Sequence, residues 1–195
     1  MADQVGRGPL NVSDQARAVF LDRDGVLNEA VVRNGKPFSP MSVEEVVIPP
    51  DVPAALSLLR QNGFRLVMIT NQPDIARGLQ SRETVYAINR FLQDGLGVDA
   101  SETCEHDDSD HCDCRKPKPG MLIRAAARDR IALSESFMVG DRWRDIEAGR
   151  RAGCKTILLG DGYGEQFKSS PDVTFATFGE AAKWILQQSV QRGPT

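Results

Sequence analysis

The sequence predicts an α/β fold, a Rossmann-like parallel sheet with helices on both faces. Short apolar runs alternate along the chain with segments in which apolar residues recur at helical spacing. Polar residues gather directly after several of these runs, as they do at the carboxyl ends of parallel strands. A length of 195 residues with 41% hydrophobic and 26% charged residues suits one globular domain with a real core. We expect this domain over residues 17–190, after a flexible polar arm over residues 1–16.

Four strands are expected, because each is a short apolar run that ends in a turn or a polar segment. They cover residues 18–21, 65–70, 136–140 and 155–159. Five helices are expected between and after them, at residues 52–60, 81–92, 120–128, 145–152 and 181–188. Asp51 is the expected N-cap of the first helix and Gly63 its stop, whereas Gly95 and Gly97 end the second helix.

A short flap is expected between the first strand and the first helix. Residues 29–42 contain Arg33-Asn-Gly-Lys36, which is a hairpin turn signal. The segment is too short to form a large cap domain. Arg33 and Lys36 could help to capture an anion, but solvated loop charges are the favoured interpretation because loops carry charge by default.

The composition argues against several classes of protein. A formal net charge of −3 disfavours a nucleic-acid coat, and no apolar run approaches the ~20 residues that span a bilayer. The N-terminal residues lack the apolar centre of a secretory signal. We therefore expect a cytoplasmic monomer that binds neither membrane nor nucleic acid. An enzyme acting on phosphorylated polynucleotide ends is disfavoured as well, since the chain shows no basic, aromatic-lined groove.

The polar residues that follow the expected strands make a chemically coherent set. They are Asp22, Asp24, Thr70, Asn71 and Asp141, with Lys116 ahead of the helix that leads into the third strand. Carboxylates beside a phosphate suit Mg²⁺, which takes few protein ligands and keeps waters. A lysine and a hydroxyl can oppose the charge on transferring phosphoryl oxygens. The set therefore predicts phosphoryl chemistry on a small phosphorylated metabolite.

Asp22 and Asp24 allow a division of labour. One carboxylate can attack phosphorus and form an aspartyl-phosphate. The other can protonate the leaving oxygen and then take a proton from the attacking water. An Asp-x-Asp-Gly motif alone is often only a turn or a calcium-type loop, so the assignment depends on the other segments.

Four segments together resemble the haloacid dehalogenase (HAD) superfamily of phosphatases. They are Asp22-Arg-Asp-Gly-Val, Thr70-Asn-Gln, Lys116-Pro-Lys-Pro-Gly and Gly140-Asp-Arg-Trp-Arg-Asp145, in this order over residues 17–160. The resemblance implies a HAD-type core with Asp22 as nucleophile and Asp24 as general acid/base. It also implies that Thr70 and Lys116 hold the phosphoryl oxygens, with Lys118 as the competitor for the lysine role.

The resemblance also implies the metal and substrate contacts. Mg²⁺ would be bound by Asp22, Asp141 and the backbone carbonyl of Asp24, with Asp145 supporting the metal shell. Substrate contacts are expected from Asn71, Gln72, Arg115 and Arg142. The roles of Arg77 and Trp143 stay open, because each could either contact substrate or support a helix.

A second metal site is predicted between residues 104 and 114. Cys104, His106, Cys112 and Cys114 supply three sulfurs and one imidazole, a set suited to structural, tetrahedral Zn²⁺. A redox pair of thiols is the alternative use of the cysteines. His111 is a minor alternative to His106, because simultaneous ligation by His111 and its neighbour Cys112 is awkward. In a reducing compartment such a cluster favours metal.

Cys-x-His followed by Cys-x-Cys-Arg-Lys-Pro resembles the zinc-bearing branch of the superfamily, which contains heptose bisphosphate phosphatases and histidinol-phosphate phosphatase domains. Thr70-Asn-Gln-Pro-Asp-Ile-Ala-Arg-Gly78 favours the sugar bisphosphate as substrate, whereas the five-residue spacer between His106 and Cys112 favours histidinol phosphate. A non-catalytic, zinc-stabilised module that binds phosphorylated ligands is the alternative from another class. The presence of Asp22, Asp24 and Asp141 speaks for the enzyme.

Overall fold

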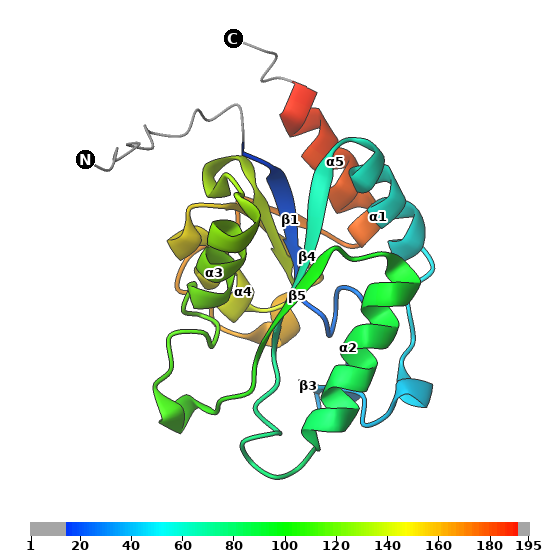
Figure 1. Ribbon diagram of the computed structural model, residues 1–195, viewed down its shortest axis with the longest axis vertical. Coiled ribbons are helices and arrows are strands. Elements are labelled where there is room, and N and C mark those ends of the chain that lie inside the picture. The colour runs from blue at the N-terminus through cyan, green and yellow to red at the C-terminus, as the bar shows by residue number, and fades with distance from the viewer. Residues whose placement is uncertain (1–14, 191–195) are drawn as a thin grey trace, which may run out of the picture.

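The computed structural model describes residues 15–190 and has a single parallel sheet between two layers of helices (Figure 1). Nearly all of the arm expected over residues 1–16 lies outside the described residues. The strand order is β5-β4-β1-β6-β7-β8. The strands are β1 (Arg17–Leu21), β4 (Phe64–Asn71), β5 (Ala100–Cys104), β6 (Phe137–Gly140), β7 (Lys155–Leu159) and β8 (Val173–Phe175). The predicted fold class is therefore confirmed.

Alternating side chains of the central strand enter two separate cores. Val19 and Leu21 pack in the core under α1 (Val52–Gln61) and α5 (Phe178–Val190). Ala18 and Phe20 pack in the core under α3 (Gly120–Asp129) and α4 (Trp143–Ala152). Figure 1 shows these two helix pairs on opposite sides of the sheet. This two-sided burial explains why β1 reads as a continuous apolar run.

The expected helices are all present, with α2 at Arg82–Leu96, and two expected capping roles change. Ser81 caps α2 by accepting from the Thr84 amide, and Gly97 ends it with φ +65°, whereas Gly95 lies within it. Asp51 precedes α1 but its side chain makes no cap there. Its Oδ2 accepts from the Gly179 amide at 2.7 Å, so this carboxylate stabilises the first turn of α5 instead.

The flap is a two-stranded antiparallel hairpin of β2 (Val31–Arg33) and β3 (Lys36–Phe38). It lies outside the main sheet, in the connection between β1 and α1. The backbone amide of Glu29 donates to the carbonyl of Val47 at 2.8 Å, which closes the base of this segment. Within residues 15–190, no helix combines the length and the hydropathy that crossing a membrane requires.

The register brings the carboxyl ends of three strands to the same edge of the sheet, where β4 extends three residues beyond the partner of Leu21. Leu21 pairs with Met68 of β4 and with Val139 of β6. The Asp22 amide then donates to the Val139 carbonyl at 3.0 Å. Residues that directly follow β1 and β6 therefore meet the last residues of β4 at one edge of the sheet.

Candidate active site

A pocket of about 300 Å³ opens at this edge of the sheet. Its acidic lining residues are Asp22, Asp24, Asp74, Asp108, Asp141 and Asp145. Its basic lining residues are Arg77, Arg115, Lys116, Arg142 and Arg144. The flap contributes Pro37, Phe38 and Ser39. The acids expected from two separate sequence segments thus share one cavity.

Lys116 is the central cation of the pocket and is only 2% exposed. Its Nζ lies 2.7 Å from Asp22 Oδ1 and 2.6 Å from Asp145 Oδ1, and donates to the Ile69 carbonyl at 2.9 Å. An ammonium has three protons, so all of them are used. Burial opposes its charge, but the Asp145 and Asp22 carboxylates outweigh burial and raise the pKa of Lys116.

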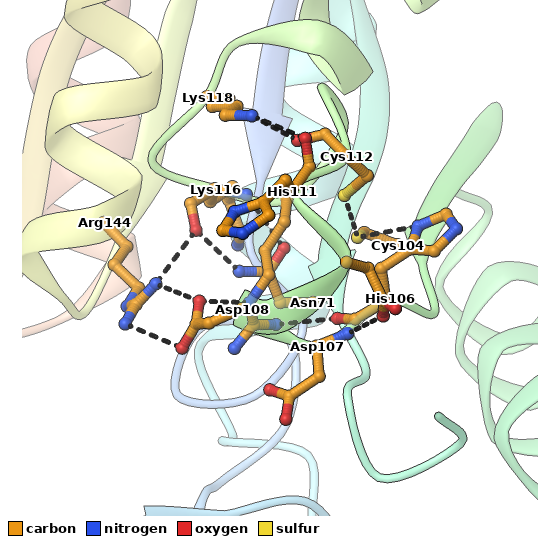
Figure 2. A network of polar contacts seen from close by, with 12 residues as sticks. Asn71, Cys104, His106, Asp107, Asp108, His111, Cys112, Lys116, Lys118 and Arg144 are labelled. Atoms are coloured by element: carbon orange, nitrogen blue, oxygen red, sulfur yellow. Dashed lines mark hydrogen bonds and ion pairs between the residues drawn. The ribbon is translucent and has the colours of Figure 1, made fainter. Parts of the chain in front are cut away.

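Lys118, the sequence competitor of Lys116, lies elsewhere. Its Nζ donates to the carbonyls of His111 and Cys112, at 3.0 and 2.7 Å, and Figure 2 shows it directed at that loop. Lys116 therefore lies at the pocket, and Lys118 braces the loop beside it.

Three carboxylates form a group that could hold a cation. Asp22, Asp141 and Asp145 each offer an oxygen within 4.8 Å of the others. Burial first, and then the charge of Asp145, raises the pKa of Asp22 to about 7. Burial and the charge of Asp22 likewise raise the pKa of Asp141. Both Asp141 oxygens are buried without a hydrogen-bond partner among residues 15–190, so this donor set fits a hard divalent cation.

Two glycines allow these acids to come so close. Gly25 has φ +92°, and a Cβ there would lie 1.8 Å from Asp141 Oδ2. A Cβ on Gly140 would lie 2.1 Å from the Cβ of Asp145. The glycines of Asp-x-Asp-Gly and Val-Gly-Asp are therefore needed for close approach of the carboxylates.

The Asp24 carboxylate lies outside this group and accepts five hydrogen bonds, from Arg23 (3.1 and 2.9 Å), Asn28 (3.0 Å), Ser39 (2.8 Å) and Gln72 (3.0 Å). Burial alone would raise its pKa, but the charge and hydrogen bonds of fully buried Arg23 lower it. Arg23 is anchored in turn by the Asn89 side chain of α2 at 2.9 Å. Asp24 is thus held in one orientation from several elements.

Gln72, a predicted substrate contact, is buried beneath the pocket and does not line it. Its amide nitrogen donates to Thr70 Oγ1 at 2.9 Å as well as to Asp24. Thr70 is itself 1% exposed. Asn71 does line the pocket, but its amide also exchanges two hydrogen bonds with the Lys116 backbone, at 3.0 and 3.1 Å. This stretch therefore mainly supports Asp24 and Lys116.

The predicted arginines line the rim, each with an acidic partner. Arg115 donates to Asp108 at 2.8 Å, and Arg142 is paired with Glu165. Arg77, left open by the sequence, pairs with Asp107 and Asp74, and it also lines the pocket.

Sequence reasoning missed Arg144, Asp108, Arg23 and Ser39. Arg144 lies against the Trp143 ring at 5.0 Å and donates to the Asp108 carboxylate at 3.1 Å, a contact visible in Figure 2. Ser39 carries no motif. The Arg of Asp22-Arg-Asp lies between two prominent acids, which was the available signal for Arg23.

The cysteine cluster forms the second site. Cys114 Sγ lies 3.3 Å from the sulfurs of Cys104 and Cys112, and 3.2 Å from His106 Nδ1. Ligand atoms 2.0–2.3 Å from one tetrahedral ion would be about 3.6–3.8 Å apart, close to these distances. His111 is outside the group. The Cys₃His arrangement is thus one that could hold a metal ion, with His106 and not His111 placed to offer the nitrogen.

Comparison with known proteins gives consistent relatives. A HAD-hydrolase-like family model matches residues 113–181. The D-glycero-D-manno-heptose-1,7-bisphosphate 7-phosphatase of Chlorobaculum tepidum is 35% identical over 170 residues, covering 78% of this chain and 83% of that protein. The enzyme of the same name from Thermosynechococcus vestitus is 34% identical, covering 90% and 98%. The crystal structure of D,D-heptose 1,7-bisphosphate phosphatase from Bordetella bronchiseptica, complexed with magnesium and phosphate, superposes with a TM-score of 0.77 at 31% identity, covering 88% and 99%.

Proposed function

The chain belongs to the D-glycero-D-manno-heptose-1,7-bisphosphate 7-phosphatase family of HAD-like phosphatases, and from this we propose that it removes the 7-phosphate of that sugar bisphosphate. The observation that carries the proposal is the pocket in which Lys116 bridges Asp22 and Asp145 beside the unpartnered carboxylate of Asp141. This arrangement suits a phosphoryl group and a cation together.

Asp22 is the nucleophile in this proposal. Its Oδ1 accepts from the Lys116 ammonium and from the Arg23 amide, each at 2.7 Å. No residue of the described chain donates to Oδ2, which is left to attack phosphorus. The new bond joins Asp22 to phosphorus while the bond from phosphorus to the sugar oxygen breaks.

Asp24 is the general acid/base in this proposal. It gives a proton to the leaving sugar oxygen and later takes one from the water that hydrolyses the aspartyl-phosphate. Thr70, Lys116 and the backbone that follows β4 orient the phosphoryl oxygens. Asn71 holds the Lys116 backbone in place through its paired amide bonds.

Mg²⁺ is the proposed catalytic cofactor, in line with the magnesium in the Bordetella structure. Asp22, Asp141 and the Asp24 backbone carbonyl would hold it, with Asp145 in support. The ion would neutralise negative charge that gathers on the phosphoryl oxygens. Asp145 is already engaged by Lys116 and by the Arg142 amide, which suits an indirect role.

The second phosphate of the substrate would bind at the rim. Arg115, Arg142 and Arg144 all line the pocket, and each now pairs with a carboxylate that a phosphate could replace. Histidinol phosphate carries an ammonium instead of a second phosphate, so it would gain less from three arginines.

Zn²⁺ is the proposed occupant of the Cys104, His106, Cys112 and Cys114 cluster, where it would stabilise the loop 104–114. The thiolates that it needs fit a cytoplasmic enzyme. We further propose one domain over residues 17–190 that works as a monomer.

The test is a specificity assay with purified protein and Mg²⁺. Heptose 1,7-bisphosphate, histidinol phosphate and fructose 1,6-bisphosphate are compared, and the heptose should give the highest kcat/KM. Asp22→Asn should abolish hydrolysis with the fold intact, whereas Asp94→Asn on the exposed face of α2 should be as active as the parent protein. A preference for histidinol phosphate would overturn the proposed substrate, and an active Asp22→Asn protein would overturn the assignment of Asp22 as nucleophile.

A further inference from the structure

We propose that Ser39 of the flap is a positioning residue that aims the Asp24 carboxyl at the leaving oxygen, so that proton transfer to the leaving group depends on the flap. The inference deepens the proposed phosphatase activity and rests on it. Ser39 directly follows β3, and its Oγ lies 2.8 Å from Asp24 Oδ2.

The direction of this hydrogen bond follows from its neighbours. The Gln72 amide nitrogen lies between Asp24 Oδ2 and Thr70 Oγ1, which leaves its carbonyl oxygen facing Ser39 at 3.2 Å. If the side-chain amide of Gln72 were flipped, its oxygen would face the Asp24 carboxylate, and two hydrogen-bond acceptors would repel each other. Ser39 has one proton, and the shorter contact to the charged carboxylate takes it.

Ser39 differs in kind from the other donors to Asp24. Arg23, Asn28 and Gln72 are at most 1% exposed and belong to the β1 and β4 ends of the sheet. Ser39 is partly exposed, lines the pocket and belongs to the flap. It is therefore the one donor to this carboxylate, among the described residues, whose position depends on the hairpin.

The flap is anchored directly beside this serine. The side chain of Gln80, which follows β4 in the chain, donates to the carbonyl of buried Pro40 at 2.9 Å. On the other side of Ser39, Pro37 and Phe38 line the pocket. A sugar that contacts these residues would press on the same short segment that carries Ser39, which couples substrate binding to the orientation of Asp24.

Leaving groups separate this role from a structural one. A sugar alkoxide needs a proton to leave, whereas p-nitrophenolate leaves without one. Loss of one charge-assisted hydrogen bond should cost about tenfold in kcat/KM on the sugar bisphosphate. We expect Ser39→Ala to show this loss while its kcat/KM on p-nitrophenyl phosphate, which reports only the steps up to departure of the leaving group, and its melting temperature stay unchanged.

A double-mutant cycle supplies the second test. In an Asp24→Asn background, Ser39→Ala should cause no further loss, because the group through which it acts is gone. Ser42→Ala is the matched control, since Ser42 lies three residues along the same segment and makes no hydrogen bond to Asp24 within the described chain.

The outcomes are distinct. Equal losses on both substrates, or a tenfold loss that persists in the Asp24→Asn background, would overturn the role of Ser39 and leave the phosphatase intact. A wild-type protein that hydrolyses neither substrate would overturn the proposed function, and with it this inference.

Discussion

Replacement of Lys116 by Met should destabilise the protein strongly, because it removes the cation that compensates three buried acids. The Lys116 ammonium lies 2.7 Å from Asp22 and 2.6 Å from Asp145. With an effective dielectric constant of about 20, each contact is worth about 6 kcal/mol of Coulomb attraction before desolvation is subtracted. Loss of one partner of a buried ion pair costs about 3–5 kcal/mol net, which is the expected fall in the free energy of unfolding.

Urea unfolding in magnesium-free buffer at pH 8 measures this loss. The control is Lys183→Met on the exposed face of α5, for which a change within about 0.5 kcal/mol is expected. The pKa of Asp22 is already raised to about 7 and should rise further without the ammonium. The folded variant would then bind protons that the unfolded chain does not, so the difference from wild type should shrink as the pH falls from 8 to 5.

Two results would refute this reasoning. A loss below about 1 kcal/mol at pH 8 would mean that the carboxylates do not depend on Lys116 for their charge. A large loss that is independent of pH would mean that packing, and not charge, explains the destabilisation.

Three further predictions concern the two metal sites and the ion pairs of Glu147 in α4. Cys112→Ser should lower the zinc content, measured by elemental analysis, and the melting temperature, and activity should fall as a consequence. An unchanged zinc content would show that Cys112 is not a ligand. Gly25→Ala should raise the Mg²⁺ concentration needed for half-maximal activity, because the added Cβ displaces Asp141. Gly35→Ala is the control, since Gly35 has φ +72° and nothing lies within 4 Å of the added Cβ. It should lower the free energy of unfolding by only about 1–2 kcal/mol through backbone strain. Hydrogen bonds from neighbouring arginines lower the pKa of Glu147 to about 2, so its stabilisation is present above its ordinary value of 4.5 and lost as the pH falls toward 2. The melting temperature of Glu147→Gln should be lower than that of wild type at pH 7, and the two should converge near pH 2. A difference in melting temperature that stays constant with pH would contradict this.

The strands that the sequence predicted are those buried on both faces. β1, β4, β6 and β7 are apolar runs because helices cover both of their sides. β5 (Ala-Ser-Glu-Thr-Cys) and β8 (Val-Thr-Phe) lie at the two edges of the sheet and are only partly buried. Neither has an apolar run, so hydropathy gave no signal for them. Their place in the sheet comes from pairing with β4 and β7.

The acids that the sequence predicted in the pocket follow strands, whereas the missed residues depend on tertiary contacts. Asp22 and Asp141 follow strands and carry motifs, so their convergence could be inferred from parallel topology alone. Ser39 lies 15 residues from Asp24 in a flap without a motif, and its contact depends on how the hairpin folds back. Gln72 was expected at the substrate because it stands in a motif, but alternation along the chain after β4 buries it.

The missed edge strand also explains how the cysteine cluster is connected to the pocket. Cys104 is the last residue of β5 and pairs with Asn71, while the Gln72 amide donates to its carbonyl at 2.7 Å. Cys114 lies two residues before Lys116, so the cluster joins the end of β5 to the segment that supplies the central ammonium. Asn71 binds the Lys116 backbone from the other side. A metal bound by these cysteines would therefore fix Lys116 relative to β4, which makes a stable loop a condition for placing the charge that Asp22 requires.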